Sequence, residues 1–231
     1  MDRQDELLEK EDGRYYAIDK FDTGLASLAT TEKLNKTLVS FGLPSGPALF
    51  LHLAHNAFTE IKDVDPITLF DDHQQGIWPD SQLRLFDFLE RSIAHVVFSF
   101  TAIEAFANEA IPETFTYEMV RKGIASTLNK QEIERWVSLD EKLHAVLPKI
   151  FSLPTPKGKH VWDKYKAIKD IRDRIIHLKM ADRKASGPEV ETIWGELLRE
   201  HKKTWCDDAH EIIGYFEPAV RNRRWFKKYP Y

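Results

Sequence analysis

Three observations predict that this 231-residue chain has an all-α fold, an antiparallel helical bundle. Apolar residues recur at steps of three and four over several long segments, which is the period of a helix with one buried face. Proline and glycine fall between these segments and separate them. No convincing run of alternating polar and apolar residues is present, so the sequence predicts helices packed on helices and no sheet.

The N-terminal third predicts two helices and then a connection. Residues 30–41 are expected to form a short helix that ends at the glycine and proline just after them. A second helix is expected over 48–61, because a serine can cap its start and a proline suits its first turn. Residues 63–79 hold several turn-forming residues and no sustained period, which places a boundary near position 78. We therefore separate a helical extension of unknown role, 1–78, from a helical bundle, 79–220.

The bundle is expected to begin with a long helix that runs from Ser81 to Pro112. Its apolar positions recur at three and four residues and neighbouring lines are apolar too, so the helix should be well buried. It carries too many ionisable residues for a membrane span. Residues 116–128 are predicted to form a further helix.

Two capping boxes mark the next helix starts. In each, a short polar side chain stands three residues before a glutamate: Asn129 before Glu132, and Ser138 before Glu141. The second pair is expected to begin a helix that runs to Ile150.

Three more helices complete the predicted bundle. An apolar stripe at three and four spacing runs over 162–178, and shorter helical segments follow over 189–201 and 204–218. The remaining residues, 221–231, mix cations with aromatic rings and are expected to form a basic-aromatic tail.

Composition narrows the class of protein. The formal net charge of -4 means that the molecule as a whole is no polycation, so any contact with nucleic acid must be local. A single cysteine, Cys206, excludes an internal disulfide framework and fits a reducing compartment. The acidic N-terminus lacks the apolar stretch of a secretory signal. We expect a cytoplasmic protein that does not enter a membrane.

The residues that most suggest chemistry lie near the end of the 162–178 helix. Arg172 can hold a phosphate at any accessible pH, and His177 can take and give a proton near neutrality. Phosphodiester cleavage needs both abilities. Five residues turn a helix by about 140°, so the two side chains cannot both face one phosphate from one undistorted helix. We expect two copies to pack these helices across a two-fold axis, as a homodimer.

Arg172 followed by Asp173, three further residues and His177 resembles the Arg, polar residue, gap, His signature of HEPN domains. Upstream, residues 98–109 are similar to an apolar helix of those bundles, and the resemblance covers roughly 80–218. It implies a HEPN-like bundle and a metal-independent endoribonuclease with its site at a dimer interface, as in prokaryotic defence and toxin–antitoxin pairs. RNA would be the substrate, no cofactor would be needed, and an antitoxin or regulatory protein is a possible partner.

The resemblance also assigns roles to the motif. His177 would transfer protons around the ribose 2′-OH or the leaving 5′-oxygen, Arg172 would hold the scissile phosphate, and Asp173 would orient its neighbours. Cleavage would leave a 2′,3′-cyclic phosphate and a 5′-hydroxyl. One HEPN toxin carries a modified tyrosine two residues after the histidine. This chain has Lys179 there, which puts regulation by that modification in doubt.

Three polar residues of the long apolar helix are expected to lie next to the motif residues and to orient them, without contacting RNA. Thr101, Glu104 and Asn108 lie on one line of that helix, where unpaired polar groups would be costly. They must find partners, either next to the motif or elsewhere in the bundle, where they would fix its register.

RNA contacts are expected from Arg174 and from three tail residues, Arg223, Arg224 and Trp225, since cations suit phosphates and aromatic rings suit bases. The alternative for the tail is that Trp225 packs onto the bundle.

Two further interpretations of the chain stay open. The motif could belong to a catalytically inactive HEPN-like module that binds RNA, a nucleotide or a protein, or the fold could be only an interaction scaffold. His52 and His55, three apart on a helix, could face a metal ion, but no third ligand of evident spacing accompanies them, and we predict no metal site.

Overall fold

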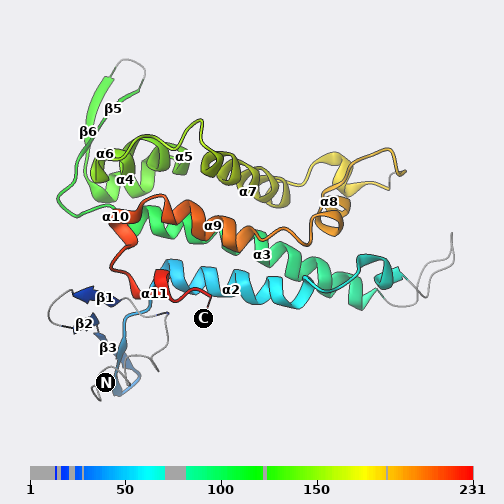
Figure 1. The fold of residues 1–231 in the computed structure, drawn as a ribbon, viewed down its shortest axis with the longest axis horizontal. Coiled ribbons are helices and arrows are strands. Elements are labelled where there is room, and N and C mark those ends of the chain that lie inside the picture. The colour runs from blue at the N-terminus through cyan, green and yellow to red at the C-terminus, as the bar shows by residue number, and fades with distance from the viewer. Residues whose placement is uncertain are drawn as a thin grey trace.

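The computed structural model describes residues 14, 17–20, 24–27, 29–70, 82–121, 124–185 and 187–230. Most of them are helical, as the sequence predicts, and the long helices lie side by side (Figure 1). Among the described residues there are also three two-stranded antiparallel sheets, so the fold is mostly helical rather than all-α. Figure 1 places these hairpins at one end of the helical body.

The centre of the fold is α3 (Leu83–Glu109), which packs against α2 (Gly46–Ile61), α7 (His160–Ile176) and α9 (Trp205–Gly214). All four helices contribute to one buried core, for example through Leu51, Ile103, Ile168 and Ile213. The predicted boundary near position 78 lies outside the described residues, and the helices before and after it, α2 and α3, share this core. Within the described part of the chain, neither α3 nor any other helix is long and apolar enough to span a membrane.

Local sequence explains the start of α2 and the polar groups inside α3. Ser45 has the extended backbone of an N-cap and Pro47 lies in the first turn, although the Ser45 hydroxyl makes no capping hydrogen bond. In α3, the hydroxyls of Ser92 and Ser99 donate to the carbonyl oxygens four residues earlier, at 2.9 and 2.7 Å. These bonds satisfy two buried hydroxyls without a partner from another helix.

Two of the predicted helices are β-hairpins, so both predictions are wrong. The segment 30–41 forms β3 (Ala29–Leu34) and β4 (Thr37–Gly42), and 116–128 forms β5 (Tyr117–Arg121) and β6 (Ile124–Leu128). A further hairpin pairs β1 (Ala17–Lys20) with β2 (Gly24–Ser27).

The β3–β4 hairpin has a local cause that the hydrophobic pattern does not reveal. Asn35 has φ 56°, a left-handed conformation that asparagine tolerates better than most residues, and it stands in the two-residue turn between Leu34 and Thr37. The hydroxyls of Thr31 and Ser40 bond across the strands at 2.7 Å. Most of these residues are exposed, so the alternation that identifies a half-buried strand is missing.

The two predicted capping boxes do start helices. At α4 (Lys130–Trp136), the Glu132 N–H donates to Asn129 at 3.0 Å and the Asn129 N–H donates to the Glu132 carboxylate at 2.8 Å, so this box is complete. Ser138 accepts from the N–H of Glu141 at 3.2 Å. The helix that follows is made of α5 (Leu139–Glu141), a π-helical turn η2 (Lys142–Val146) and α6 (Leu147–Phe151).

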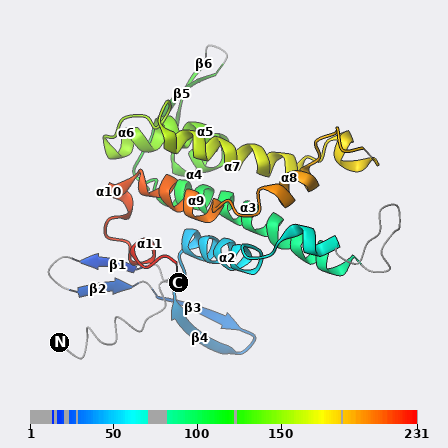
Figure 2. The ribbon, with the colours of Figure 1, turned by 45° about the vertical axis from the view of Figure 1, so that its right-hand side comes forward.

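The C-terminal third is more broken than predicted. The segment 189–201 contains only α8 (Ile193–Arg199), preceded by the short η3 (Met180–Arg183), and 204–218 holds α9 and the start of α10 (Glu217–Val220). Earlier in the chain, η1 (Pro66–Phe70) occupies part of the predicted connection. The expected tail is folded: α11 (Arg224–Lys227) lies beside β1, as Figure 2 shows, and Trp225 belongs to the core.

Two isoleucines of α7 give a matched test of this packing. Ile168 is fully buried, whereas Ile176 is 50% exposed. We expect Ile168→Ala to lower the free energy of unfolding by about 3 kcal/mol, because it opens a cavity in the core, and Ile176→Ala by less than about 1 kcal/mol. Urea unfolding followed by circular dichroism measures both. Equal losses would contradict the placement of α7.

Candidate functional site

The helix α7 presents Arg172 and His177 in different settings. Tyr165, Ile168 and Ile171 form its buried face. His177 is the C-cap residue just beyond the helix, with φ -115° and ψ 64°, and its backbone N–H donates to the carbonyl oxygen of Asp173 at 2.9 Å. Its side chain is exposed. The imidazole is therefore held at a fixed backbone position and is accessible from solvent.

Arg172 is held against α3. Its guanidinium carbon lies 4.7 Å from the centre of the Phe100 ring, and it donates to the carboxylate of Asp173 at 2.9 Å. Phe100 stacks in turn on Tyr165, with ring centroids 6.4 Å apart. The side chain of Arg172 remains 30% exposed. An aromatic face and a carboxylate thus fix the direction of the guanidinium without enclosing it.

A cavity of about 560 Å³ lies beside His177, between the C-terminal half of α7, α8 and the start of α9. Besides His177 its lining includes Asp170, Asp173, Arg174, Lys179, Lys203 and Trp205. Arg172 does not line it. Within one chain, therefore, the structure does not bring Arg172 and His177 into a common cavity. This agrees with the angle of about 140° that five residues impose along a helix.

Sequence reasoning missed Lys203 and Trp205 as neighbours of His177. Lys203 lies over the Trp205 ring at 5.0 Å and pairs with Glu200 at 2.6 Å. A cation two residues before an aromatic residue, at the start of a predicted helix, was the available signal. Only the packing of α9 against α7 places the two residues beside the cavity.

Arg174 has a structural role, which corrects its expected role in RNA binding. It pairs with Glu196 at 2.7 Å and with Asp182 at 3.4 Å, and donates to the carbonyl oxygen of Glu191 at 2.8 Å. The Asp182 side chain is fully buried and also accepts the N–H of Ile193 at 2.7 Å. Together these bonds fasten η3 and α8 to α7.

The polar residues of α3 find partners within the bundle. Asn108 accepts a hydrogen bond from Lys142 at 2.8 Å, and Thr101 donates to the carbonyl oxygen of Val97 at 2.8 Å. Burial lowers the pKa of Lys142, whereas the charges of Glu104 and Glu134 oppose that shift. The Asn108–Lys142 bond supports the interpretation that Asn108 fixes the position of η2 against α3, whereas Glu104 is exposed and acts on Lys142 through its charge.

Burial also corrects the expected RNA contacts of two residues of the C-terminal segment, Arg224 and Trp225. Trp225 is 1% exposed and Arg224 is 6% exposed, so neither offers a face to a base or a phosphate. Arg223 is partly buried. Trp225 packed onto the bundle was the alternative that the sequence left open.

Comparison with known proteins identifies no relative of this chain. No family model matches it, and no curated protein or solved structure matches it either. Any proposal about function therefore rests on the chain's own residues.

The Arg174–Asp182 pair gives a test with a defined pH dependence. The N–H of Ile193, the N–H of Lys179 and the charge of Arg174 hold the pKa of Asp182 below its ordinary value. A lowered pKa in the folded state stabilises the fold above the unfolded pKa of about 3.9, and this contribution is lost as the pH falls through the folded pKa.

We therefore expect Asp182→Asn to lower the free energy of unfolding by about 2 kcal/mol at pH 7, and the difference from the wild type to shrink below about pH 4. Urea unfolding at both pH values measures it. The exposed Asp170→Asn on α7 is the control and should change stability by less than about 0.5 kcal/mol. A difference that grows on acidification would contradict the assignment.

Proposed function

We propose that this protein is a metal-independent endoribonuclease of the HEPN type, acting in prokaryotic defence or toxin–antitoxin biology, with a site shared by two copies of the chain. The observation that supports it best is the exposed imidazole of His177 at the edge of a cavity that Lys179 and Lys203 also line. An imidazole can move protons and two ammonium groups can attract a phosphodiester. An antitoxin or other regulatory partner belongs to the same proposal.

The reaction needs two proton transfers, one from the ribose 2′-OH and one to the leaving 5′-oxygen. His177 removes the proton of a ribose 2′-OH, and the oxygen attacks the adjacent phosphorus. The bond from phosphorus to the 5′-oxygen breaks, and the leaving oxygen takes a proton from a second imidazole or from water. The products are a 2′,3′-cyclic phosphate and a 5′-hydroxyl. The nucleophile is part of the substrate, so the reaction can proceed without a bound metal ion.

The position of Arg172 is the reason to propose a site formed by two copies of the chain. It lies on the α3 side of α7, away from the cavity that His177 lines. Across a two-fold axis between α7 helices, the guanidinium of one copy can approach the phosphate beside His177 of the other. Asp173, which Arg172 contacts, also lines the cavity. This contact would direct the guanidinium of Arg172 toward the cavity side of α7. There the positive charge would stabilise the charge that builds on the phosphate oxygens.

A second candidate is a module that binds RNA or a nucleotide without cleaving it. The observation that favours it is the engagement of the arginines: Arg172 packs on Phe100 and Arg174 is committed to Asp182 and Glu196. Lys179 and Lys203 would then hold a phosphate in the cavity without an arginine to stabilise a transition state.

Cleavage of RNA in EDTA distinguishes the two candidates. We expect the wild type to release fragments with 2′,3′-cyclic phosphate ends and His177→Ala to be slower by about 10²- to 10⁴-fold, the typical contribution of an acid–base group. His160→Ala, at the exposed N-terminal end of the same helix, is the control and should retain full activity. Circular dichroism in EDTA checks the fold. RNA binding without cleavage by the wild type would favour the module.

Mixing two inactive variants tests the shared site. Arg172→Ala and His177→Ala should each be nearly inactive, because each removes one half of every site. After exchange of subunits, half of the dimers would be mixed, and each would regain one of two sites, so about a quarter of the wild-type rate should return. Sedimentation measures the dimer and fluorescence-labelled RNA measures the rate. A monomer, or a dimer without recovery, would contradict a site formed between copies.

A further inference from the structure

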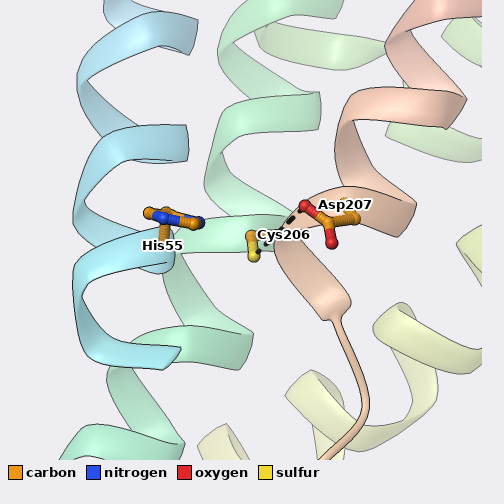
Figure 3. Close-up of side chains that lie close together, drawn as sticks. All are labelled: His55, Cys206 and Asp207. Atoms are coloured by element: carbon orange, nitrogen blue, oxygen red, sulfur yellow. Dashed lines mark hydrogen bonds between the residues drawn. The ribbon is translucent and has the colours of Figure 1, made fainter. Parts of the chain in front are cut away.

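Three residues with metal-binding side chains meet where α2 lies against the first turn of α9. Figure 3 shows the imidazole of His55, from α2, facing Cys206 and Asp207, from α9. One potential ligand atom from each lies within 4.8 Å of the other two. The thiol of Cys206 is 3.9 Å from an oxygen of Asp207. The cluster was not evident from sequence, because His55 is far from Cys206 along the chain.

We propose that His55, Cys206 and Asp207 bind a divalent transition metal ion of the zinc class, which joins α2 to α9. Nitrogen, sulfur and carboxylate oxygen are the ligands that zinc takes from proteins. Bonds of 2.0 to 2.3 Å in a tetrahedron set neighbouring ligand atoms about 3.4 Å apart, so the three groups need to approach by roughly 1 Å. Three protein ligands leave the fourth position for water.

An unpaired ring nitrogen supports the site independently of the spacing. The Nδ1 atom of His55 is buried and has no hydrogen-bond partner among the described residues. Buried polar atoms are seldom left unpaired in folded proteins, and a bound ion can account for an exception. One turn earlier, the Nε2 atom of His52 bonds with Asn56 at 3.1 Å, and His52 is not one of the residues that meet Cys206 and Asp207 in the cluster. Coordination would give the His55 ring the partner that it lacks.

Residues around the cluster hold the two ligands of α9 in place. The backbone N–H of Cys206 donates to His95 of α3 at 3.2 Å, and the hydroxyl of Tyr229 donates to Asp207 at 3.0 Å. The ring of His210 stacks on Tyr229, with centroids 4.6 Å apart. Tyr229 and the thiol of Cys206 both bond to the Oδ1 atom of Asp207, so these contacts use only one of its two carboxylate oxygens. Such outer contacts commonly orient metal ligands.

Binding would exchange a proton for the metal without any change of oxidation state. The S–H bond of Cys206 breaks, the proton leaves to solvent and a metal–sulfur bond forms. The ion would then hold the first turn of α9, which also carries Trp205 of the cavity beside His177. The site concerns the stability of the fold and does not depend on whether the protein cleaves RNA.

Cobalt(II) is a direct probe of this site. We expect the chelator-treated full chain to bind one Co²⁺ and to show a thiolate-to-cobalt charge-transfer band in the near ultraviolet and the strong visible bands of tetrahedral cobalt. Zinc should displace both. His55→Asn and Asp207→Asn should weaken binding by at least about 100-fold, and Tyr229→Phe by about 10- to 100-fold, the typical range for a residue that orients a ligand.

Two neighbouring substitutions serve as matched controls. His52→Asn lies on the same helix as His55, and Asp208→Asn follows Asp207 but pairs with Lys164 at 2.7 Å. Both should retain the cobalt spectrum, and circular dichroism verifies that all variants are folded. A wild type without the charge-transfer band, or equal spectra in the His55 and His52 variants, would overturn the proposal and leave a hydrogen-bonded packing cluster.

Discussion

The burial of α3 by three other helices is the constraint on which the rest of the structure depends. A helix with so many apolar positions around its circumference cannot remain stable with one face covered, so α2, α7 and α9 must all pack on it. Because α7 uses Ile168 and Ile171 for this purpose, the residues between and after them face other directions. The positions of Arg172 and His177 follow from that packing.

The packing of α7 gives two nearby arginines different surroundings and therefore different roles. Arg174 and Arg172 are two residues apart, yet Arg174 enters an ion-pair network with the buried Asp182 while Arg172, itself partly exposed, packs on the buried ring of Phe100. A buried carboxylate must be compensated, so Arg174 is not free to serve a substrate. Arg172 pairs with the more exposed Asp173 and keeps part of its own surface exposed, which is why it remains the better candidate for a phosphate.

The first turn of α9 links the two sites that we propose. Trp205 lines the cavity beside His177, whereas Cys206 and Asp207 point toward His55 on α2. Successive residues of a helix point about 100° apart, so one turn can contribute to both sides of the helix. An ion bound on one side would limit the movement of the residue on the other. The proposed metal site would therefore support the cavity without taking part in its chemistry.

The sequence by itself determined the long helices, the side-chain caps of the short helices α4 and α5, and the chemical character of the motif. The apolar period over α3 and α7, and the pairs Asn129–Glu132 and Ser138–Glu141, depend on residues within a few positions of each other, so they can be read locally. The tertiary structure decided what depends on distant residues. The burial of Trp225, the partners of Arg174 and the meeting of His55 with Cys206 arise from packing between segments far apart in the chain. The two hairpins that were predicted as helices were missed for another reason, since strands with few buried side chains gain their stability from pairing with each other and leave no clear period in the sequence.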